Sequence, residues 1–163
     1  MNIKEKYFTA SFRFDKSKSE DFNLKKVEGE DYFIDKLGNH WIQDYLWDNG
    51  WGNEYGFIKL PELNFEELWT LLIDSNIFEN YQGASEIINR KHPFELKNKL
   101  QALFSTNQKL NRRLTKRIGL LELGVNRNEV IGVKKEEVEK NYLEWKKLKT
   151  DFEKLSKKRC WIF

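Results

Sequence analysis

The chain has 163 residues, 15% of them aromatic and only two of them proline, so it has enough apolar material for a packed core and lacks the composition of a disordered protein. A single cysteine, Cys160, excludes an intramolecular disulfide, and no stretch approaches the roughly 18 apolar residues of a membrane-spanning helix. The net charge of +3 hides a strong asymmetry along the sequence.

That asymmetry places most acidic side chains first. Residues 1–89 carry 9 Lys/Arg against 17 Asp/Glu, a net charge of −8, whereas residues 90–118 carry 9 against one, Glu95, a net charge of +8. The remaining residues carry 11 against 8, a net charge of +3. Such a division indicates surfaces that meet other charged surfaces.

The composition also bears on domain organisation and location. Nine glycines and two prolines leave no room for a long flexible linker, so a single domain over residues 1–163 is expected. The N-terminal segment lacks the continuous apolar core of a signal peptide, and one cysteine is consistent with a reducing compartment. The expected location is therefore cytoplasmic.

Short strands are predicted in the first 60 residues. Residues 8–14 alternate between apolar and polar side chains, which is the period of a half-buried strand. Four further short segments, bounded by turn signals that contain glycine, lie at 22–27, 32–34, 41–47 and 55–60. This spacing predicts an antiparallel meander over about residues 6–60.

Helical spacing begins after Pro61. Five apolar side chains between Phe65 and Ile73 recur at i, i+3, i+4, i+7 and i+8, so they line one face of a helix. Asn64 stands three residues before Glu67, which is the pattern of a capping box at a helix start.

More helices are predicted in the second half of the chain. A short one is expected at 84–90, and Pro93 suits the first turn of the next. After a break at 124–132, residues 134–158 give the most regular helical pattern, with apolar side chains that recur every seven residues at Val138, Trp145 and Phe152. This spacing would also suit a coiled-coil dimer, but coiled coils usually extend over three to four heptads, so packing within the chain is favoured.

Taken together, the elements predict an α+β fold in which sheet comes before helix. The N-terminal antiparallel sheet occupies about residues 6–60, and the helical part ends in a long amphipathic helix at about 134–158. The sheet-rich part is thus 1–60 and the helical part 61–163.

An acidic segment rich in aromatic residues is the first candidate binding surface. Tyr and Trp are common anchors of protein interfaces, and surrounding acids would steer a basic partner. The function predicted from this surface is a small protein-binding module, and an inhibitor or immunity-type protein that blocks a basic toxin would fit it. The same aromatic side chains would instead form the core of the sheet if they pointed inward. The candidate contact residues are Trp41, Asp44, Tyr45, Trp47, Asp48, Trp51, Glu54 and Tyr55.

A basic helical stretch supports an alternative function, nucleic-acid binding. A basic helix face is the electrostatic footprint of proteins that contact phosphates, although the acidic first half would repel them. A helix-turn-helix is disfavoured because the connection after this stretch is longer than the usual three or four residues. The candidate residues are Lys109, Arg112, Arg113, Lys116 and Arg117.

Catalytic and metal chemistry find less support. His40, Asp44 and Asp48 recur every four residues and would share one face of a helix, but the segment reads equally well as a strand that would separate them. No metal, cofactor or catalytic residue is therefore predicted. An enzyme of unknown chemistry that uses Asp44, Asp48 or Glu54 as a carboxylate stays a further alternative.

A histidine before a helix and the C-terminal cysteine are two further candidates for chemistry. His92 directly precedes Pro93 and is expected at a helix start. The last four residues, Cys160 to Phe163, match the pattern of a prenylation box after a basic run. Because Trp161 is a poor aliphatic residue, packing of this tail against the domain is favoured.

Overall fold

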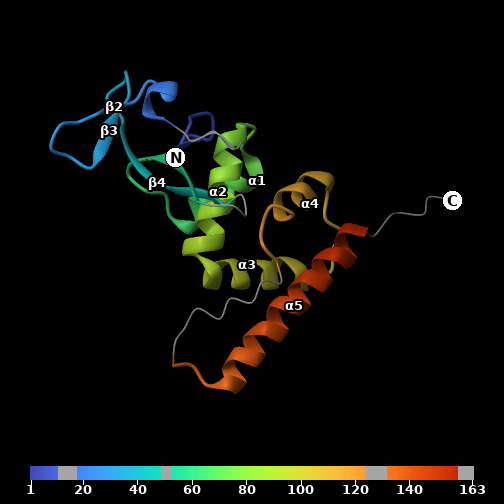
Figure 1. Cartoon of the computed structure of the whole chain (residues 1–163). Helices are drawn as coiled ribbons and strands as arrows, with labels where there is room; N and C mark the ends of the chain where they lie inside the picture. Colours follow the sequence, from blue (N-terminus) through green and yellow to red (C-terminus); the bar gives the residue numbers. More distant parts are fainter. Residues whose placement is uncertain (11–17, 49–52, 124–131, 158–163) are drawn as a thin grey trace. The chain divides into compact units, whose positions relative to one another are not determined.

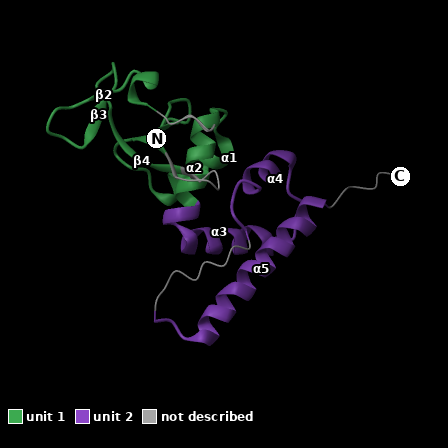
Figure 2. Ribbon diagram, in the orientation of Figure 1, with its two compact units in different colours: residues 1–88 green, residues 89–163 purple. Residues whose placement is uncertain are grey.

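The computed structural model of the chain describes residues 1–10, 18–48, 53–123 and 132–157 (Figure 1). In these residues five strands are followed by five α-helices, so the predicted α+β fold is confirmed. The contacts group the chain into two compact units, residues 1–88 and 89–163 (Figure 2). The single domain over 1–163 stays a prediction.

The strands of the first unit form one antiparallel sheet. Its order is β1-β5-β4-β3-β2, so β2 to β5 make the predicted meander, while β1 adds to the outer edge of β5 through the pairs Phe8↔Ile58 and Thr9↔Phe57. A short 3₁₀ helix, η1 (Ser19–Phe22), takes up part of the predicted strand at 22–27. The strands are β1 (Phe8–Thr9), β2 (Lys25–Lys26), β3 (Tyr32–Ile34), β4 (His40–Asp48) and β5 (Asn53–Lys59).

One face of this sheet carries an aromatic cluster. Phe33 and Trp41 are directly opposite each other on β3 and β4, and the Phe33 ring meets the Phe57 ring edge to face at 5.0 Å. Leu24 completes the buried cluster, and Phe22 of η1 packs against it with its ring 6.0 Å from that of Phe57. Since opposite residues in an antiparallel pair point to the same face, the register alone brings these rings together.

The other face of the sheet carries Phe8 and meets a helix. Phe8 and Ile58 are paired and buried, and the Phe8 ring lies directly against the backbone of Gly83. The two helices of this part of the chain are α1 (Phe65–Asp74) and α2 (Phe78–Lys91), which begins six residues earlier than predicted.

Helix α1 begins with the capping box that the sequence predicts. The Asn64 side chain accepts a hydrogen bond from the Glu67 N–H, and the Glu67 carboxylate accepts one from the Asn64 N–H, each at 3.0 Å. Two helix-end donors are thereby satisfied. Leu68, Leu71 and Leu72 are buried on the inner face of the helix.

The second unit is helical and is organised around α3 (Pro93–Ser105), α4 (Arg112–Ile118) and α5 (Lys135–Lys157). Helix α3 buries Leu96, Leu100 and Phe104, and α5 buries Trp145, Leu148 and Leu155, so the heptad-spaced face of α5 packs within the chain. The Lys97 ammonium lies 2.7 Å from the Glu144 carboxylate and ties the two helices together. None of the described helices is long and apolar enough to cross a membrane.

Candidate binding sites

Trp41 belongs to the core and not to a contact surface. Only 5% of the residue is exposed, and its indole N–H donates a hydrogen bond to Asp35 Oδ2 at 3.1 Å. Its position opposite Phe33 turns the ring into the aromatic cluster. The interpretation of this residue as a partner-binding residue is therefore corrected.

Tyr45 and Tyr55 face each other across β4 and β5. Tyr55 is 53% exposed, whereas Tyr45 is half-buried. Both side chains lie on the same face of the two-stranded ribbon that β4 and β5 form, the β4–β5 ribbon. The Asp44 carboxylate accepts a hydrogen bond from the Tyr45 N–H at 2.7 Å. These three candidate contact residues are therefore close in space.

The other candidate contact residues follow toward the end of the ribbon. Trp47 is paired with Glu54 after a bulge that separates it from Tyr45, and Asp48 is paired with Asn53. The side chains of Trp47, Asp48 and Glu54, and all of Trp51, lie outside the described residues.

The pattern of His40, Asp44 and Asp48 falls on a strand and not on a helix. Successive members of this set are about 13 Å apart at the usual rise of about 3.3 Å per residue, and the register of β4 with β5 shifts between Tyr45 and Trp47. The exposed His40 ring instead stacks on Tyr32 with ring centroids 4.5 Å apart. Among the described residues no group of three or more His, Cys, Asp or Glu could hold a metal ion.

The basic candidates gather on α4 and the residues before it. Asn111 caps this seven-residue helix by accepting a hydrogen bond from the Leu114 N–H at 2.9 Å. Leu110 and Ile118 are buried, so their side chains anchor this segment in the core of the second unit. Four of the five basic candidates are exposed, and Arg117 is half-buried; they are Lys109, Arg112, Arg113, Lys116 and Arg117.

The connection from α4 to α5 does not fit a helix-turn-helix. Residues 119–134 separate the two helices, which is far longer than the usual turn of three or four residues. The unit as a whole is nevertheless strongly basic, because residues 89–163 carry 20 Lys/Arg against 9 Asp/Glu, a net charge of +11.

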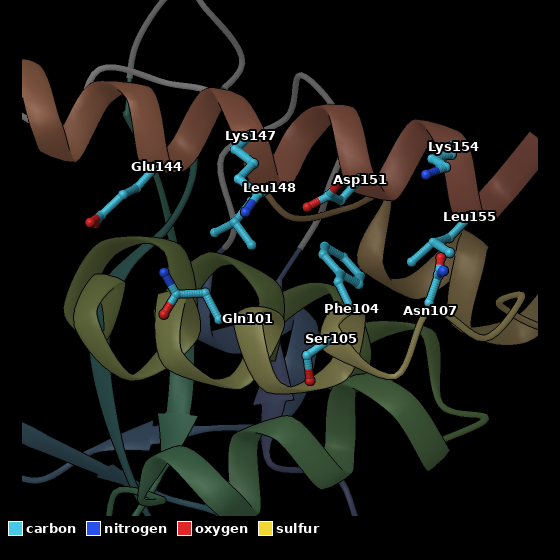
Figure 3. A pocket seen from close by; sticks show the side chains of 10 residues that line it. All are labelled: Gln101, Phe104, Ser105, Asn107, Glu144, Lys147, Leu148, Asp151, Lys154 and Leu155. Carbon is cyan, nitrogen blue, oxygen red and sulfur yellow. The ribbon is translucent and has the colours of Figure 1, made fainter.

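A cavity of about 620 Å³ lies between α3 and α5 (Figure 3). Phe104 of α3 points up toward α5, and Leu148 and Leu155 of α5 point down toward α3. Polar and charged side chains surround this apolar strip. The lining residues are Gln101, Phe104, Ser105, Asn107, Glu144, Lys147, Leu148, Asp151, Lys154 and Leu155.

Two polar side chains that line this cavity, Glu144 and Ser105, are already engaged in hydrogen bonds. The hydrogen bond from Lys97 lowers the pKa of Glu144, so this carboxyl group is ionised at neutral pH and is no proton donor. The Ser105 hydroxyl donates to the Ala102 carbonyl at 2.8 Å, and neither His nor Cys lines the cavity to activate it.

A second cavity, of about 530 Å³, lies in the first unit beside the edge strand β2. These residues carry no motif in the sequence, and their one visible signal is the presence of Lys25, Lys26 and Lys36 in an acidic half of the chain. The residues that line this cavity lie in or next to η1, β2 and the end of β3. The lining residues are Glu20, Asn23, Leu24, Lys25, Lys26, Val27, Ile34, Asp35 and Lys36.

Asp35 is the most heavily hydrogen-bonded side chain near this cavity. One of its oxygens accepts from the N–H groups of Leu37 and Asn39, each at 2.9 Å, and the other from Asn39 Nδ2 at 2.8 Å and from Trp41 Nε1. Burial by itself would raise the pKa of Asp35, but these hydrogen bonds outweigh it, those from Asn39 most strongly, and hold the pKa below its usual value.

His92 and Cys160 are the two remaining candidates for chemistry. His92 stands directly before α3, with its Nδ1 3.3 Å from the Glu95 carboxylate, as expected for a residue at a helix start. Cys160 and the tail that follows it lie outside the described residues.

Comparisons of the chain with protein-family models, with curated proteins and with solved structures find no match. A functional interpretation therefore rests on the charge, the exposure and the shape of these surfaces.

Proposed function

We propose that the protein is a protein-binding module and that the part of the β4–β5 ribbon around Tyr45 and Tyr55 is its contact surface. The observation that carries this proposal is the pair Tyr45 and Tyr55, which face each other on one side of the ribbon with Tyr55 53% exposed. An exposed tyrosine is a suitable anchor because its ring offers apolar area and its hydroxyl group a hydrogen bond.

The charge of the first unit indicates the kind of partner. Residues 1–88 carry 9 Lys/Arg against 17 Asp/Glu, a net charge of −8. An acidic surface attracts a basic protein over a Debye length of about 10 Å at 0.1 M salt and speeds its association. An inhibitor of the immunity type, which covers the basic site of a toxin or nuclease, fits such a surface.

The proposal is tested by replacing Tyr55 with alanine. Proteins captured by the immobilised wild-type chain are identified by mass spectrometry, and the affinity of each purified partner is then measured. Because an anchoring tyrosine contributes about 2 kcal/mol or more, the Tyr55→Ala variant should bind the true partner roughly thirtyfold more weakly. The partner should be basic, and its association should slow as salt is added.

Tyr142→Ala is the matched control, because Tyr142 is a 40% exposed tyrosine on α5 in the other unit. This variant should retain the partner with unchanged affinity. Equal affinities for the wild-type chain and for Tyr55→Ala, with the fold intact by circular dichroism, would refute the contact surface.

A second function, nucleic-acid binding, is favoured by a separate observation. The exposed side chains of Lys109, Arg112 and Lys116 lie on or next to α4, in a unit with a net charge of +11. The first turn of α4 contains no acidic residue that would repel phosphate. Contacts of this kind release counterions, so affinity falls linearly with the logarithm of salt concentration.

This alternative is tested with a fluorescently labelled oligonucleotide. The triple variant Lys109→Gln, Arg112→Gln, Lys116→Gln should bind more weakly and should reduce the salt slope by up to about three, one for each lost phosphate contact. A wild-type chain whose binding does not depend on salt would exclude the nucleic-acid function.

A further inference from the structure

We propose that the cavity beside β2 binds a small amphipathic anion, with an aliphatic chain and a carboxylate head. This site is separate from the contact surface at Tyr45 and Tyr55 and does not depend on it. Its approximate volume of 530 Å³ falls within the range of about 300–1,000 Å³ that is usual for small-molecule sites.

The apolar part of the cavity suits a flexible aliphatic chain. Three of the lining residues are aliphatic: Val27 and Ile34 are half-buried, and Leu24, which is 4% exposed, also belongs to the buried aromatic cluster around Phe33. No aromatic residue is among the lining residues, and a stacking platform for a planar ligand is therefore absent from this described part of the chain. When an alkyl chain moves out of water and packs against these side chains, its binding is stabilised by about 0.8 kcal/mol for each buried CH₂ group.

The cavity carries positive charge, although the unit that contains it is acidic. The first unit is acidic overall, yet three of its nine basic residues, Lys25, Lys26 and Lys36, line this one cavity. All three are exposed, and none has an ion-pair partner among the residues that the structure describes. Their ammonium groups can therefore donate hydrogen bonds to a ligand carboxylate without first breaking an ion pair with a described residue.

The positions of the three lysines identify the pair that faces the ligand. Lys25 is paired with Ile34, so its side chain shares the face of that apolar residue. Lys26 is paired with Phe33 on the opposite face, and its ammonium lies 5.8 Å from the centre of the Phe33 ring. Lys36 follows the end of β3, is exposed and makes no ring contact with another described residue. Lys25 and Lys36 are therefore the expected contacts of the carboxylate head.

The two acids of the lining differ in how strongly they oppose an anion. The Asp35 carboxylate already accepts four hydrogen bonds from the β3–β4 turn and from Trp41, which spread and compensate its charge. The Glu20 side chain is exposed on η1 and makes no hydrogen bond or ion pair with another described residue. Removal of the Glu20 charge should therefore strengthen the binding of an anion.

The test is a titration of the ¹⁵N-labelled full chain with octanoate, followed by amide chemical shifts. Saturable shifts are expected in residues 20–36. Octanol, which has the same chain length without the charge, and acetate, which has the head without the chain, should each bind about tenfold more weakly or worse, a difference of about 1.4 kcal/mol. Absence of saturable octanoate binding, or equal binding of octanol, would overturn the proposal.

Three charge variants locate the site. Lys25→Gln with Lys36→Gln should weaken octanoate binding about tenfold, while Glu20→Gln should strengthen it roughly two- to fivefold through the loss of repulsion. Lys4→Gln with Lys18→Gln removes two exposed charges of the same unit outside the lining and should leave the affinity unchanged. Equal losses in the two double variants would show a general charge effect and would refute the site.

Discussion

At the scale of single residues, Asp35 holds together the turn between β3 and β4. Its carboxylate accepts hydrogen bonds from two backbone N–H groups, from Asn39 Nδ2 and from the indole of the buried Trp41. We expect Asp35→Ala to lower the free energy of unfolding by about 1–3 kcal/mol, since it leaves these donors unpaired. Urea unfolding at pH 7 measures the loss.

The same carboxyl group makes stability depend on pH. Its hydrogen bonds lower its pKa in the folded protein below the ordinary value of 3.8. The charged form therefore stabilises the fold above that ordinary value, and the contribution is lost as the pH falls through the folded pKa. The stability difference between wild type and Asp35→Asn should shrink over that range. Asp31→Asn, at an exposed acid before β3, serves as the control, and a difference that stays constant with pH would contradict this role.

Asn80 is a second residue whose two ends are both used. Its side-chain oxygen accepts from the Tyr7 N–H at 2.8 Å, its NH₂ group donates to the Glu5 carbonyl at 2.7 Å, and the residue is fully buried. The NH₂ group also lies 3.4 Å from the Ser75 hydroxyl. In Asn80→Asp a carboxylate oxygen would replace the donor to the Glu5 carbonyl, and the two oxygens would repel each other. We expect the free energy of unfolding to fall by roughly 3 kcal/mol at pH 7, more than the 0.3–1 kcal/mol that an acid near a helix start contributes.

This substitution has a distinctive pH signature. Burial raises the pKa of the introduced carboxyl group, and its protonated form can again donate to Glu5, so the variant should regain stability as the pH falls below the folded pKa. Thermal unfolding of Asn80→Asp and of the exposed control Asn76→Asp at pH 7 and pH 4.5 checks this. A loss that is the same at both pH values would exclude a buried charge as the cause.

These residues also show what the sequence can predict at this scale. The partners Asn64 and Glu67 are three residues apart, so their capping box follows from local pattern alone. Asn80 bonds to residues more than 70 positions away, and no local pattern contains that information. A tryptophan in an acidic, aromatic segment can belong either to the core or to a contact surface, and the sequence does not distinguish the two. Only the pairing of Trp41 with Phe33 in the sheet places its ring in the core.

At the scale of elements, periodicity predicts a helix or strand but not its long-range partner. Helix α5 was expected at 134–158 and occupies Lys135–Lys157, because 3.6-residue spacing over six turns is unambiguous. Strand β1 was expected in the meander, yet it pairs with β5, a neighbour almost 50 residues away. Helix α2 begins at Phe78 and contains Gly83 and the buried polar Asn80 in its first half, which masked its helical pattern.

The contact between β1 and α2 depends on Gly83. A Cβ atom at this position would collide with the ring of Phe8, which is 1% exposed and fixed in the core. Replacement of a helical glycine by alanine normally stabilises a helix by about 0.5–1 kcal/mol. Here overpacking should cost about 1–3 kcal/mol, so a net loss is expected for Gly83→Ala.

Chemical denaturation of Gly83→Ala gives the sign of this balance. Gln82→Ala, at the half-buried neighbouring position in the same helix, raises helix propensity without meeting Phe8 and should be close to neutral. The double variant Phe8→Ala with Gly83→Ala should cost less than the sum of the two single changes, because alanine at position 8 lacks the Cγ and Cδ1 atoms that the new Cβ would meet. A stabilised Gly83→Ala would show that this contact does not limit the packing.

At the scale of the whole molecule, the change of charge coincides with the division into compact units. The sequence places the change near residue 90, and the structure divides the chain between Ile88 and Asn89, within α2. Residues 1–88 have a net charge of −8 and residues 89–163 one of +11. Composition thus indicates two differently charged surfaces, but only the contacts assign each charge to one compact unit.

Two charged units of opposite sign predict an unusual behaviour on ion exchangers. Salt screens charges beyond about 10 Å at 0.1 M, so each unit should interact with a resin through its own charge and not through the net charge of +3. At pH 7.5 and about 0.1 M salt the protein should be retained on both cation and anion exchangers. The triple Gln variant at Lys109, Arg112 and Lys116 should elute earlier from the cation exchanger and no earlier from the anion exchanger, because it removes charge from the basic unit alone. Passage of the wild-type chain through the anion exchanger without retention would mean that the acidic unit presents no surface of its own to a partner.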